Sequence, residues 1–273
     1  MAKLLDGREL QGYIKARQLR QVRNLRQAEG IVPTLLIIKS PAATAATETY
    51  VRLKRQYAED VLIEVLVETV EEAQMQARIE RANHDAAIQG IIVQLPLVDA
   101  VLSEAACAAI APEKDVDGLG QHGLFPSATA SAIDCLLAGY NISLEDKKIA
   151  IVGNGKLVGN PLYRLWKERG YRVSVFDESS ADVTGTIAQS DVVVTATGVP
   201  RLITPEMIAP GSVVVDAGTA SEAGKLVGDV DPALRTRDDI TITPEKGGVG
   251  PLTIALLFDH VIEACLRQVG KLA

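Results

Sequence analysis

The segment IVGNGKLVGNP, residues 151–161, joins an apolar run to a glycine-rich turn. Gly153 and Gly155 match the first two glycines of the dinucleotide fingerprint G-x-G-x-x-G. The third position of the fingerprint holds Val158, and the glycine follows one residue later, at Gly159. Such a turn brings backbone N–H groups close to a phosphate, at the positive end of the helix that follows. The segment therefore predicts a strand, a phosphate-binding turn and a helix, as in a Rossmann-type domain.

The sequence after this turn indicates a parallel α/β sheet. Helical spacers separate five short β-branched runs, at 147–153, 171–177, 191–198, 211–218 and 239–244. This alternation predicts a doubly wound nucleotide-binding domain. We expect its first helix to begin near Lys156, and a ribose to meet Asp177, which ends the second run. The predicted cofactor contacts are Gly153, Asn154, Gly155, Lys156, Val158, Gly159, Asp177, Gly198, Gly218 and Thr219.

These features also have plainer explanations, because turn glycines often serve packing and a carboxylate that ends a strand is often solvated. The first half of the chain predicts another α/β unit, which ends near residues 115–118. Apolar periodicity favours helices at 8–30, 47–60 and 71–88, strands at 34–39, 61–68 and 90–95, and a last helix at 253–269.

Charge and composition restrict the partners and the location. The 273 residues carry a formal net charge of −7 at pH 7 and have a pI of about 5.1, which argues against nucleic acid or an anionic membrane. The cations between Lys15 and Arg26 have the spacing of one solvated helix face. Cys107, Cys135 and Cys265 lack disulfide or zinc spacing. With no signal peptide and no long uncharged apolar run, we expect a cytoplasmic protein without a metal site.

Four side chains of the first half are candidates for chemistry. Tyr50 and Lys54, in TYVRLK, are four residues apart and would share one face of a helix. Gln94 lies at the carboxyl end of a predicted strand, the edge where open α/β sheets bind ligands. Asp117 lies in the polar turn EKDVDG. Taken singly, each also fits a structural role, as a surface pair with a snorkelling amine, a strand-end cap or a turn carboxylate.

The order of motifs resembles the bifunctional methylenetetrahydrofolate dehydrogenase/cyclohydrolase family over nearly the whole chain. The matching segments are LLDG (4–7), TYVRLK (49–54), IVQLPL (92–97), PEKDVDG (112–118), VGxxxxVGxP (152–161), LVGDVD (226–231) and GGVGPLTIALL (247–257). PEKDVDG followed by GGVGPLT is specific to this family, whose longer turn also matches the late glycine. Enzymes similar to shikimate dehydrogenase share the two-domain outline but not these motifs.

The resemblance implies that 5,10-methylenetetrahydrofolate is oxidised with a nicotinamide cofactor and that the methenyl product is hydrolysed to 10-formyltetrahydrofolate. It implies a folate-binding catalytic domain of residues 1–125, onto which the C-terminal helix 253–273 packs back. Residues 126–252 would form the Rossmann-type dinucleotide-binding domain, with the folate in a cleft between the domains. A homodimer is implied as well.

The resemblance also assigns roles to single residues. Lys54 matches the family's catalytic lysine, and Gln94 matches the glutamine that hydrogen-bonds it. Tyr50 would stack near the pterin, and Asp117 would hold its amino-pyrimidine edge. The implied substrate contacts are Tyr50, Leu95, Pro96, Asp117, Gly248, Pro251 and Thr253.

The cofactor side departs from the family pattern. The family usually has Gly-Arg-Ser at the turn, whereas this chain has Asn154 in place of the arginine, and Asp177 and Glu178 replace the common His-Ser. A carboxylate beside the ribose would repel the 2′-phosphate of NADP, so the sequence favours NAD. Two alternatives stay open: a cyclohydrolase whose nucleotide site is decayed or structural, and a non-catalytic protein that binds folate or nucleotide.

Overall fold

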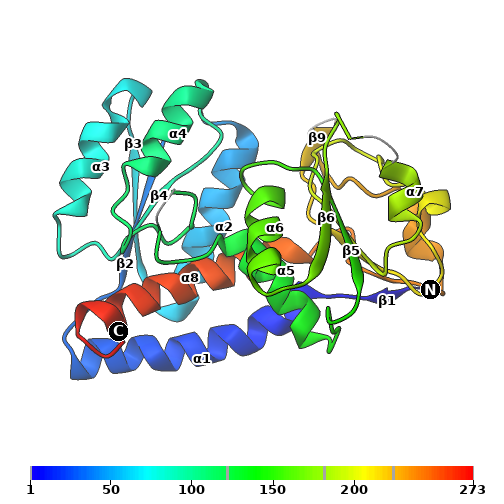
Figure 1. Cartoon of the computed structure of the whole chain (residues 1–273). Coiled ribbons are helices and arrows are strands. Elements are labelled where there is room, and N and C mark those ends of the chain that lie inside the picture. The colour runs from blue at the N-terminus through cyan, green and yellow to red at the C-terminus, as the bar shows by residue number, and fades with distance from the viewer. Residues whose placement is uncertain (1, 121–122, 181–182, 223–224, 273) are drawn as a thin grey trace. The chain divides into compact units, whose positions relative to one another are not determined.

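The computed structural model describes residues 2–120, 123–180, 183–222 and 225–272, and it contains two compact units (Figure 1). The three-stranded unit comprises Gly12–Ala128 and Ile254–Ala273, and the six-stranded unit comprises Met1–Gln11 and Thr129–Thr253. The predicted α/β class with two α/β units is confirmed. The first eleven residues differ from the predicted division, because β1 (Lys3–Leu4) pairs with β11 (Thr241–Ile242) of the six-stranded sheet.

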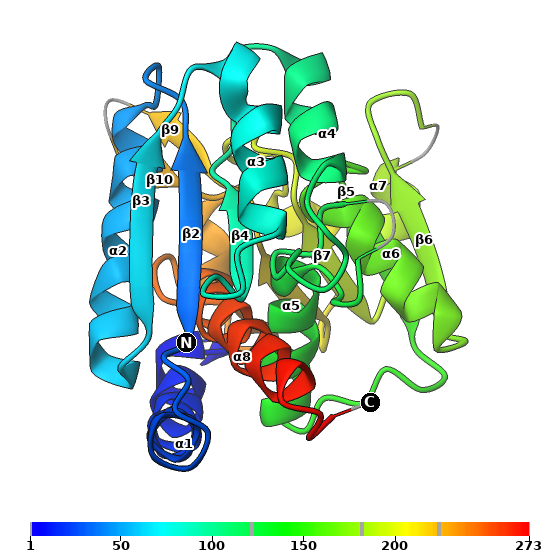
Figure 2. The same cartoon turned by 90° about the vertical axis from the view of Figure 1, so that its left-hand side faces the viewer.

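The three-stranded unit is built on the parallel strands β3-β2-β4 (Figure 2). Its elements are α1 (Gly7–Ala28), β2 (Thr34–Lys39), α2 (Ala45–Val61), β3 (Glu64–Thr69), η1 (Glu72–Gln74), α3 (Met75–Asn83), β4 (Gly90–Val93), α4 (Ala100–Ala108) and part of α8 (Val249–Gln268). Successive residues of β2 alternate between two apolar layers. Leu35 and Ile37 pack with α1, α2 and α8, whereas Leu36 and Ile38 pack with α3 and α4. Both faces of the sheet are therefore covered, as in α/β proteins.

The C-terminal helix α8 packs back on the three-stranded unit, as predicted. Among the described helices it alone has the length and mean hydropathy, 1.6, of a membrane span, and 61% of that stretch is buried inside the protein. Phe258, on this helix, is fully buried and stacks on Tyr57 of α2 with ring centroids 5.4 Å apart. This burial identifies α8 as a core helix.

The six-stranded unit has the parallel strand order β1-β11-β8-β7-β5-β6. Its further elements are α5 (Ala128–Gly139), β5 (Lys148–Val152), α6 (Gly159–Glu168), β6 (Arg172–Phe176), α7 (Val183–Ile187), β7 (Val192–Thr195), η2 (Pro205–Met207), β8 (Val213–Asp216), the antiparallel pair β9 (Ala220–Glu222) and β10 (Lys225–Val227), and η3 (Pro232–Thr236). From β5 the chain runs to β6 on one side and later to β7 on the other. The carboxyl ends of β5 and β7 therefore form the topological switch point, where open sheets of this type bind ligands.

Several predicted elements end earlier or begin later in the structure. The predicted strand 61–68 starts only at Glu64, because α2 continues to Val61 and Leu62 caps it in the left-handed conformation. The predicted helix 71–88 ends at Asn83, and the last helix begins at Val249 rather than Thr253. In the six-stranded sheet, the predicted runs extend beyond the last paired residues. Their surplus residues form the loops at the switch point.

Candidate active site

Helix α2 places Tyr50 and Lys54 on one face, as their spacing predicted. Thr44 begins the helix by accepting a hydrogen bond from the Thr47 amide at 3.2 Å. Lys54 is only 8% exposed, although a lysine rarely lies buried without a partner. Its Nζ donates to Oε1 of Gln94 at 2.9 Å, across a separation of 40 residues. The structure thus contains the lysine–glutamine pair that the resemblance implied.

Gln94 is held where β4 ends and the chain turns away. Its backbone N–H donates to the carbonyl of Ile38 at 2.8 Å, which continues the pairing of β4 with β2 by one residue. Its Nε2 donates to the carbonyl of Leu95 at 3.3 Å, and the Leu95–Pro96 peptide bond is cis. Because the amide nitrogen is engaged in this way, the amide oxygen points to Lys54. The predicted substrate contacts Leu95 and Pro96 lie directly beside this pair.

Burial changes the acid–base properties of this site. It lowers the pKa of the Lys54 ammonium below its usual range, and the nearby Asp117 carboxylate opposes part of this shift. Burial also raises the pKa of the Tyr50 phenol. A buried lysine with a neutral hydrogen-bond acceptor loses its proton more easily than a solvated one, so Lys54 has the properties of a general base.

Asp117 lies in a loop that Asp115 holds together. The Asp115 carboxylate is buried and accepts hydrogen bonds from the amides of Gly118 at 3.1 Å and Gly120 at 2.7 Å. Gly118 has a φ of +67°, and a Cβ there would lie 2.5 Å from the backbone of Pro126. Within the described part of the chain, no side chain hydrogen-bonds the half-buried carboxylate of Asp117. The loop therefore turns one aspartate inward and leaves the other available to a ligand.

His260 on α8 also supports this loop. Its Nδ1 bonds the carbonyl of Val116 at 2.8 Å, and its ring stacks on Phe125 with centroids 5.1 Å apart. Burial lowers the pKa of His260, so the neutral ring is favoured. The sequence prediction missed Asp115 and His260. The motif DVDG carried a signal for the aspartate, but nothing near His260 in the sequence connects it to residue 116.

The remaining predicted substrate contacts, Gly248, Pro251 and Thr253, belong to the six-stranded unit, where α8 begins. Gly247 has a φ of +94°, and its carbonyl accepts a hydrogen bond from the Gly7 amide at 2.8 Å. A Cβ on Gly7 would lie 1.9 Å from the carbonyl oxygen of Gly248. The motifs LLDG and GGVGP are thus two sides of one close backbone contact, which explains Gly7, and the positive φ explains Gly247.

The turn at 153–159 explains the displaced glycine of the fingerprint. Gly153 has a φ of +103°, and a Cβ there would lie 2.5 Å from the carbonyl oxygen of Ala196. Helix α6 begins at Gly159, three residues after the predicted Lys156, because residues 156–158 form an additional turn. A Cβ on Gly159 would lie 1.7 Å from the carbonyl oxygen of Gly153. Close approach therefore requires glycine at 159 and tolerates Val158 before it.

This turn fits an anionic ligand. Val158 precedes α6 without a side-chain capping bond, and the helix directs the positive end of its dipole toward the turn. A Cβ on Gly155 would meet no described atom within 4 Å, so space lies beside the backbone there. Asn154 and Lys156 are exposed on the same turn, and Asn154 accepts a bond from Nδ2 of Asn160 at 3.3 Å.

Asp177 follows β6 and is held in a polar turn. Its Oδ1 accepts hydrogen bonds from the amide and hydroxyl of Ser179 at 3.0 and 2.6 Å and from the hydroxyl of Ser180 at 3.1 Å. These bonds, first those of Ser179, lower the pKa of the exposed carboxyl. Among the described residues, none bonds Oδ2. The carboxylate is therefore ionised, fixed in orientation and open to a further donor.

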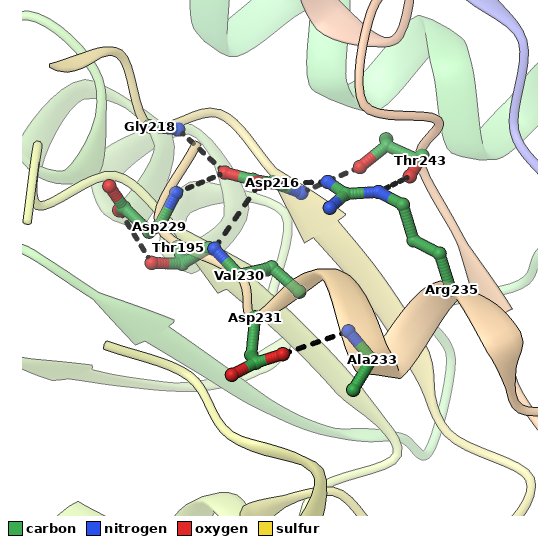
Figure 3. Close-up of polar contacts among 9 residues, drawn as sticks. All are labelled: Thr195, Asp216, Gly218, Asp229, Val230, Asp231, Ala233, Arg235 and Thr243. Atoms are coloured by element: carbon green, nitrogen blue, oxygen red, sulfur yellow. Dashed lines mark hydrogen bonds and ion pairs between the residues drawn. The ribbon is translucent and has the colours of Figure 1, made fainter. Parts of the chain in front are cut away.

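The last predicted cofactor residues lie on the loops after β7 and β8. Gly198 has a φ of +72°, and a Cβ on it would lie 3.6 Å from the carbonyl oxygen of Thr219, so these loops are neighbours. Gly218 lies against Asp229, which is completely buried beneath the loops (Figure 3). The sequence prediction did not include Asp229, although the motif LVGDVD contains it. Within the described part of the chain, no three His, Cys, Asp or Glu side chains could hold a metal ion.

Comparisons with known proteins agree with this two-part arrangement. The catalytic-domain model of tetrahydrofolate dehydrogenase/cyclohydrolase matches residues 5–117, and the NAD(P)-binding-domain model matches residues 127–269. The Bifunctional protein FolD of Herpetosiphon aurantiacus is 37% identical, with 96% of each chain covered. That of Heliobacterium modesticaldum is also 37% identical, with 98% of each chain covered.

Solved structures give the same result. The bifunctional enzyme FolD, methylenetetrahydrofolate dehydrogenase/cyclohydrolase, from Campylobacter jejuni has a TM-score of 0.91 and 32% identity, covering 98% of this chain and 100% of its own. FolD from Trypanosoma brucei, complexed with NADP cofactor and an inhibitor, has a TM-score of 0.90 and 30% identity, with 98% of both chains covered. Both family models and these relatives span the chain, which belongs to the tetrahydrofolate dehydrogenase/cyclohydrolase family.

Proposed function

We propose that this protein oxidises 5,10-methylenetetrahydrofolate to 5,10-methenyltetrahydrofolate with a nicotinamide dinucleotide and hydrolyses the product to 10-formyltetrahydrofolate. The observation that carries the proposal is the buried Lys54, paired with Gln94 and near Asp117, in a chain that both family models match. The similar enzyme from Campylobacter jejuni is named for both activities.

The hydrolysis step needs a base beside a cation. Water adds to the methenyl carbon, and a proton must leave before the ring opens to the formyl product. A permanently charged ammonium beside this cation would repel it. Burial lowers the pKa of Lys54 and so favours the neutral amine, the form that accepts a proton directly or through water. The bond from Nζ to Oε1 of Gln94 fixes the direction of the amine.

Asp117 supplies the complementary contact for the folate. Its carboxylate has two acceptor oxygens and lies in a loop whose shape Asp115 fixes. The amino-pyrimidine edge of a pterin presents donors in a guanidine-like pair, which a carboxylate matches with two charge-assisted hydrogen bonds. The buried Asp115 thus fixes the loop that positions Asp117 for binding.

The oxidation step needs a dinucleotide at the switch point of the six-stranded sheet. When bound, the oxidised nicotinamide accepts the hydride from the one-carbon bridge. The chain contributes the close-fitting glycines at 153 and 159, the uncapped start of α6 and the fixed carboxylate of Asp177. These groups bind and orient the cofactor, and orientation is the main requirement for hydride transfer.

We further propose that NAD is preferred over NADP. Asp177 offers Oδ2 to a ribose hydroxyl, and its negative charge would repel a 2′-phosphate. Asn154 provides no cation at the turn. The Trypanosoma relative was solved with NADP, so the family includes proteins that bind that cofactor, and the preference here depends on these two positions.

The deciding experiment is an assay in two parts. Reduction of NAD and of NADP is followed with methylenetetrahydrofolate, and hydrolysis of methenyltetrahydrofolate is followed without any nucleotide. Both reactions together support the proposal. Hydrolysis alone would identify a cyclohydrolase with a non-catalytic nucleotide site. If the protein catalyses neither reaction but still binds folate, it is a binding protein.

We also propose a homodimer formed through the six-stranded unit. The edge strand β6 has no partner on its outer side within the described sheet, and unpaired edges are sites of strand addition. Sedimentation equilibrium at several protein concentrations measures the assembly directly, and a monomer at all of them would refute it.

A further inference from the structure

A buried cluster of polar side chains lies at the carboxyl ends of β7 and β8 (Figure 3). Two carboxylates, Asp216 and Asp229, form its centre, and only one cation, Arg235, is ion-paired with them within the described residues, at 3.0 Å from Asp216. Among the described residues, the cluster thus pairs two carboxyl groups with one guanidinium. Buried charges without a partner are costly and need a reason.

Asp216 has all of its acceptor capacity in use. Its Oδ1 accepts from the amides of Gly218 and Asp229 at 3.1 and 3.0 Å. Its Oδ2 accepts from the amide of Val230 at 3.3 Å and from Nη2 of Arg235 at 3.0 Å. Four donors, one of them the Arg235 guanidinium, stabilise the Asp216 carboxylate. Asp216 therefore ties segment 228–230 to the end of β8 and needs no further explanation.

Asp229 is different, because its two oxygens are used unequally. Oδ2 accepts from the hydroxyl of Thr195 at 2.7 Å and from the amide of Thr197 at 2.6 Å. Oδ1 is buried and has no hydrogen-bond donor among the residues that the structure describes. Two donors therefore converge on one oxygen of the carboxyl group and none on the other, within the described residues. Native proteins rarely bury an acceptor without a donor, and such groups call for a specific cause.

The chain makes room for this carboxylate through a glycine. A Cβ on Gly218 would lie 2.0 Å from Oδ1 of Asp229, and a Cβ on Gly228 would lie 2.0 Å from Oδ2 of Asp216. Side chains at either position would push a carboxylate out of place. Both carboxylates therefore lie directly against loop backbone, and Asp229 lies between the loops after β7 and β8.

The hydrogen bonds of Asp229 hold a loop that contacts the phosphate-binding turn. Thr195 is the last residue of β7, and Thr197 is two residues into the loop that follows. Between them, the carbonyl of Ala196 lies so close to Gly153 that a Cβ there would be 2.5 Å from it. The Asp229 carboxylate thus holds in place the loop segment 195–197, which contacts the turn at the switch point.

We propose that Asp229 is a positioning residue for the dinucleotide. Through Oδ2 it holds residues 195–197 against the turn at Gly153. The position of this loop, and not full hydrogen bonding of the carboxyl group, explains why Asp229 is buried with no described donor at Oδ1. The inference rests on the proposed oxidation step and specifies which buried group sets the shape of the cofactor site. The hydrolysis step, which needs no nucleotide, should not depend on it.

The test uses Asp229→Asn, which keeps the size of the side chain but removes its charge. Charge-assisted hydrogen bonds are about twice as strong as neutral ones, so we expect Kd and KM for the dinucleotide to rise about tenfold. At saturating dinucleotide, kcat should remain within about twofold of the wild-type value. Methenyl hydrolysis should be unchanged, and amide hydrogen exchange at Thr197 should be faster.

Two further variants sharpen the result. Thr195→Val removes one donor at Oδ2 and should raise the dinucleotide Kd in the same direction by a smaller factor. Asp231→Asn is the matched control, since its carboxylate only accepts a bond from the amide of Ala233 at 2.8 Å, which an asparagine can also accept (Figure 3). This control should bind the dinucleotide as the wild type does.

The outcomes separate the two ideas. If the wild type binds a dinucleotide and Asp229→Asn binds it equally well, the positioning role is wrong while the proposed function stands. A parallel loss of dinucleotide binding and methenyl hydrolysis, with a lower Tm, would also overturn it, because Asp229 would then serve only general stability. A wild type that binds no dinucleotide would refute the proposed oxidation step, and this inference with it.

Discussion

Replacement of Lys54 by methionine separates the chemistry of this site from its stability. Methionine has nearly the length of the lysine stem and no amine, and position 54 is only 8% exposed, so the side chain can occupy the same space. Loss of a general base lowers a rate by about 10²–10⁴-fold, which corresponds to about 2.7–5.4 kcal/mol of activation free energy. We expect hydrolysis of methenyltetrahydrofolate to fall by that factor in a spectrophotometric assay.

Folate binding should survive this change. The loop at 115–120 is held by Asp115 and does not depend on Lys54, so Asp117 keeps its position. The half-exposed Gln94 loses its contact with Nζ but remains accessible to water, which replaces the bond. Equilibrium titration should therefore give a Kd for the folate within a few-fold of wild type. Hydrolysis at the wild-type rate by Lys54→Met would refute the assignment of Lys54 as the base.

The same variant tests the direction of the Lys54 pKa. Burial lowers this pKa in the folded protein, so below the unfolded value the unfolded chain binds more protons at Lys54 than the folded one. Lys54 therefore destabilises the folded state, most strongly once the pH is below the folded pKa, and the effect vanishes as the pH rises above the unfolded value. Lys54→Met removes the effect. The free energy of unfolding of the variant minus that of the wild type should be largest near neutral pH and should decrease toward alkaline pH. Denaturant titrations across that range measure this difference.

Three other changes test the remaining parts of the site. Asp117→Ala should weaken binding of substrate and product alike by about 1.5–3 kcal/mol, the range for hydrogen bonds with a charged group; an unchanged folate Kd would remove Asp117 from the pterin site. Gly159→Ala should abolish dinucleotide binding in calorimetric titration and leave methenyl hydrolysis intact, because its Cβ would lie 1.7 Å from the carbonyl oxygen of Gly153; normal binding would contradict the close approach. Asp177→Ser combined with Asn154→Arg should shift the ratio of kcat/KM values toward NADP, and a wild type that already prefers NADP would refute the argument.

The sequence predicted those features that depend on local spacing. The apolar run at 34–39 predicted β2 with the bounds that the structure has, and its four central residues pack in two apolar layers. A separation of four residues placed Tyr50 and Lys54 on one face of α2. The strand–turn–helix at 151–161 was also evident, because the close approach of Gly159 to the carbonyl of Gly153 lies within the same segment.

Element ends were less predictable for a physical reason. β-branched residues continue past the last paired position, so the runs at 191–198 and 211–218 looked longer than β7 and β8. A strand ends where its neighbour in the sheet ends, and that neighbour is distant in sequence. The start of α6 was displaced for a different, local reason, because residues 156–158 form an additional turn before the helix begins.

The polar groups that support the site depend on the same kind of distant partner. In DVDG the two aspartates are chemically identical, and no local rule decides which turns inward. In the folded loop Gly118 has a positive φ next to the backbone of Pro126, and Asp115 is buried whereas Asp117 is half-buried. Only the folded loop assigns one carboxylate to structure and the other to a ligand.

Asp229 extends this argument to the second site. Its partners Thr195 and Thr197 lie 34 and 32 residues away in sequence, and nothing in LVGDVD distinguishes it from Asp231, which only caps a short helix. Burial without full hydrogen bonding is visible only in three dimensions, and it is a stronger indication of a functional constraint than residue type. The residues proposed to contact ligands were predicted from motifs, whereas those that hold the neighbouring loops in place follow from the packing of strands that meet only in the fold.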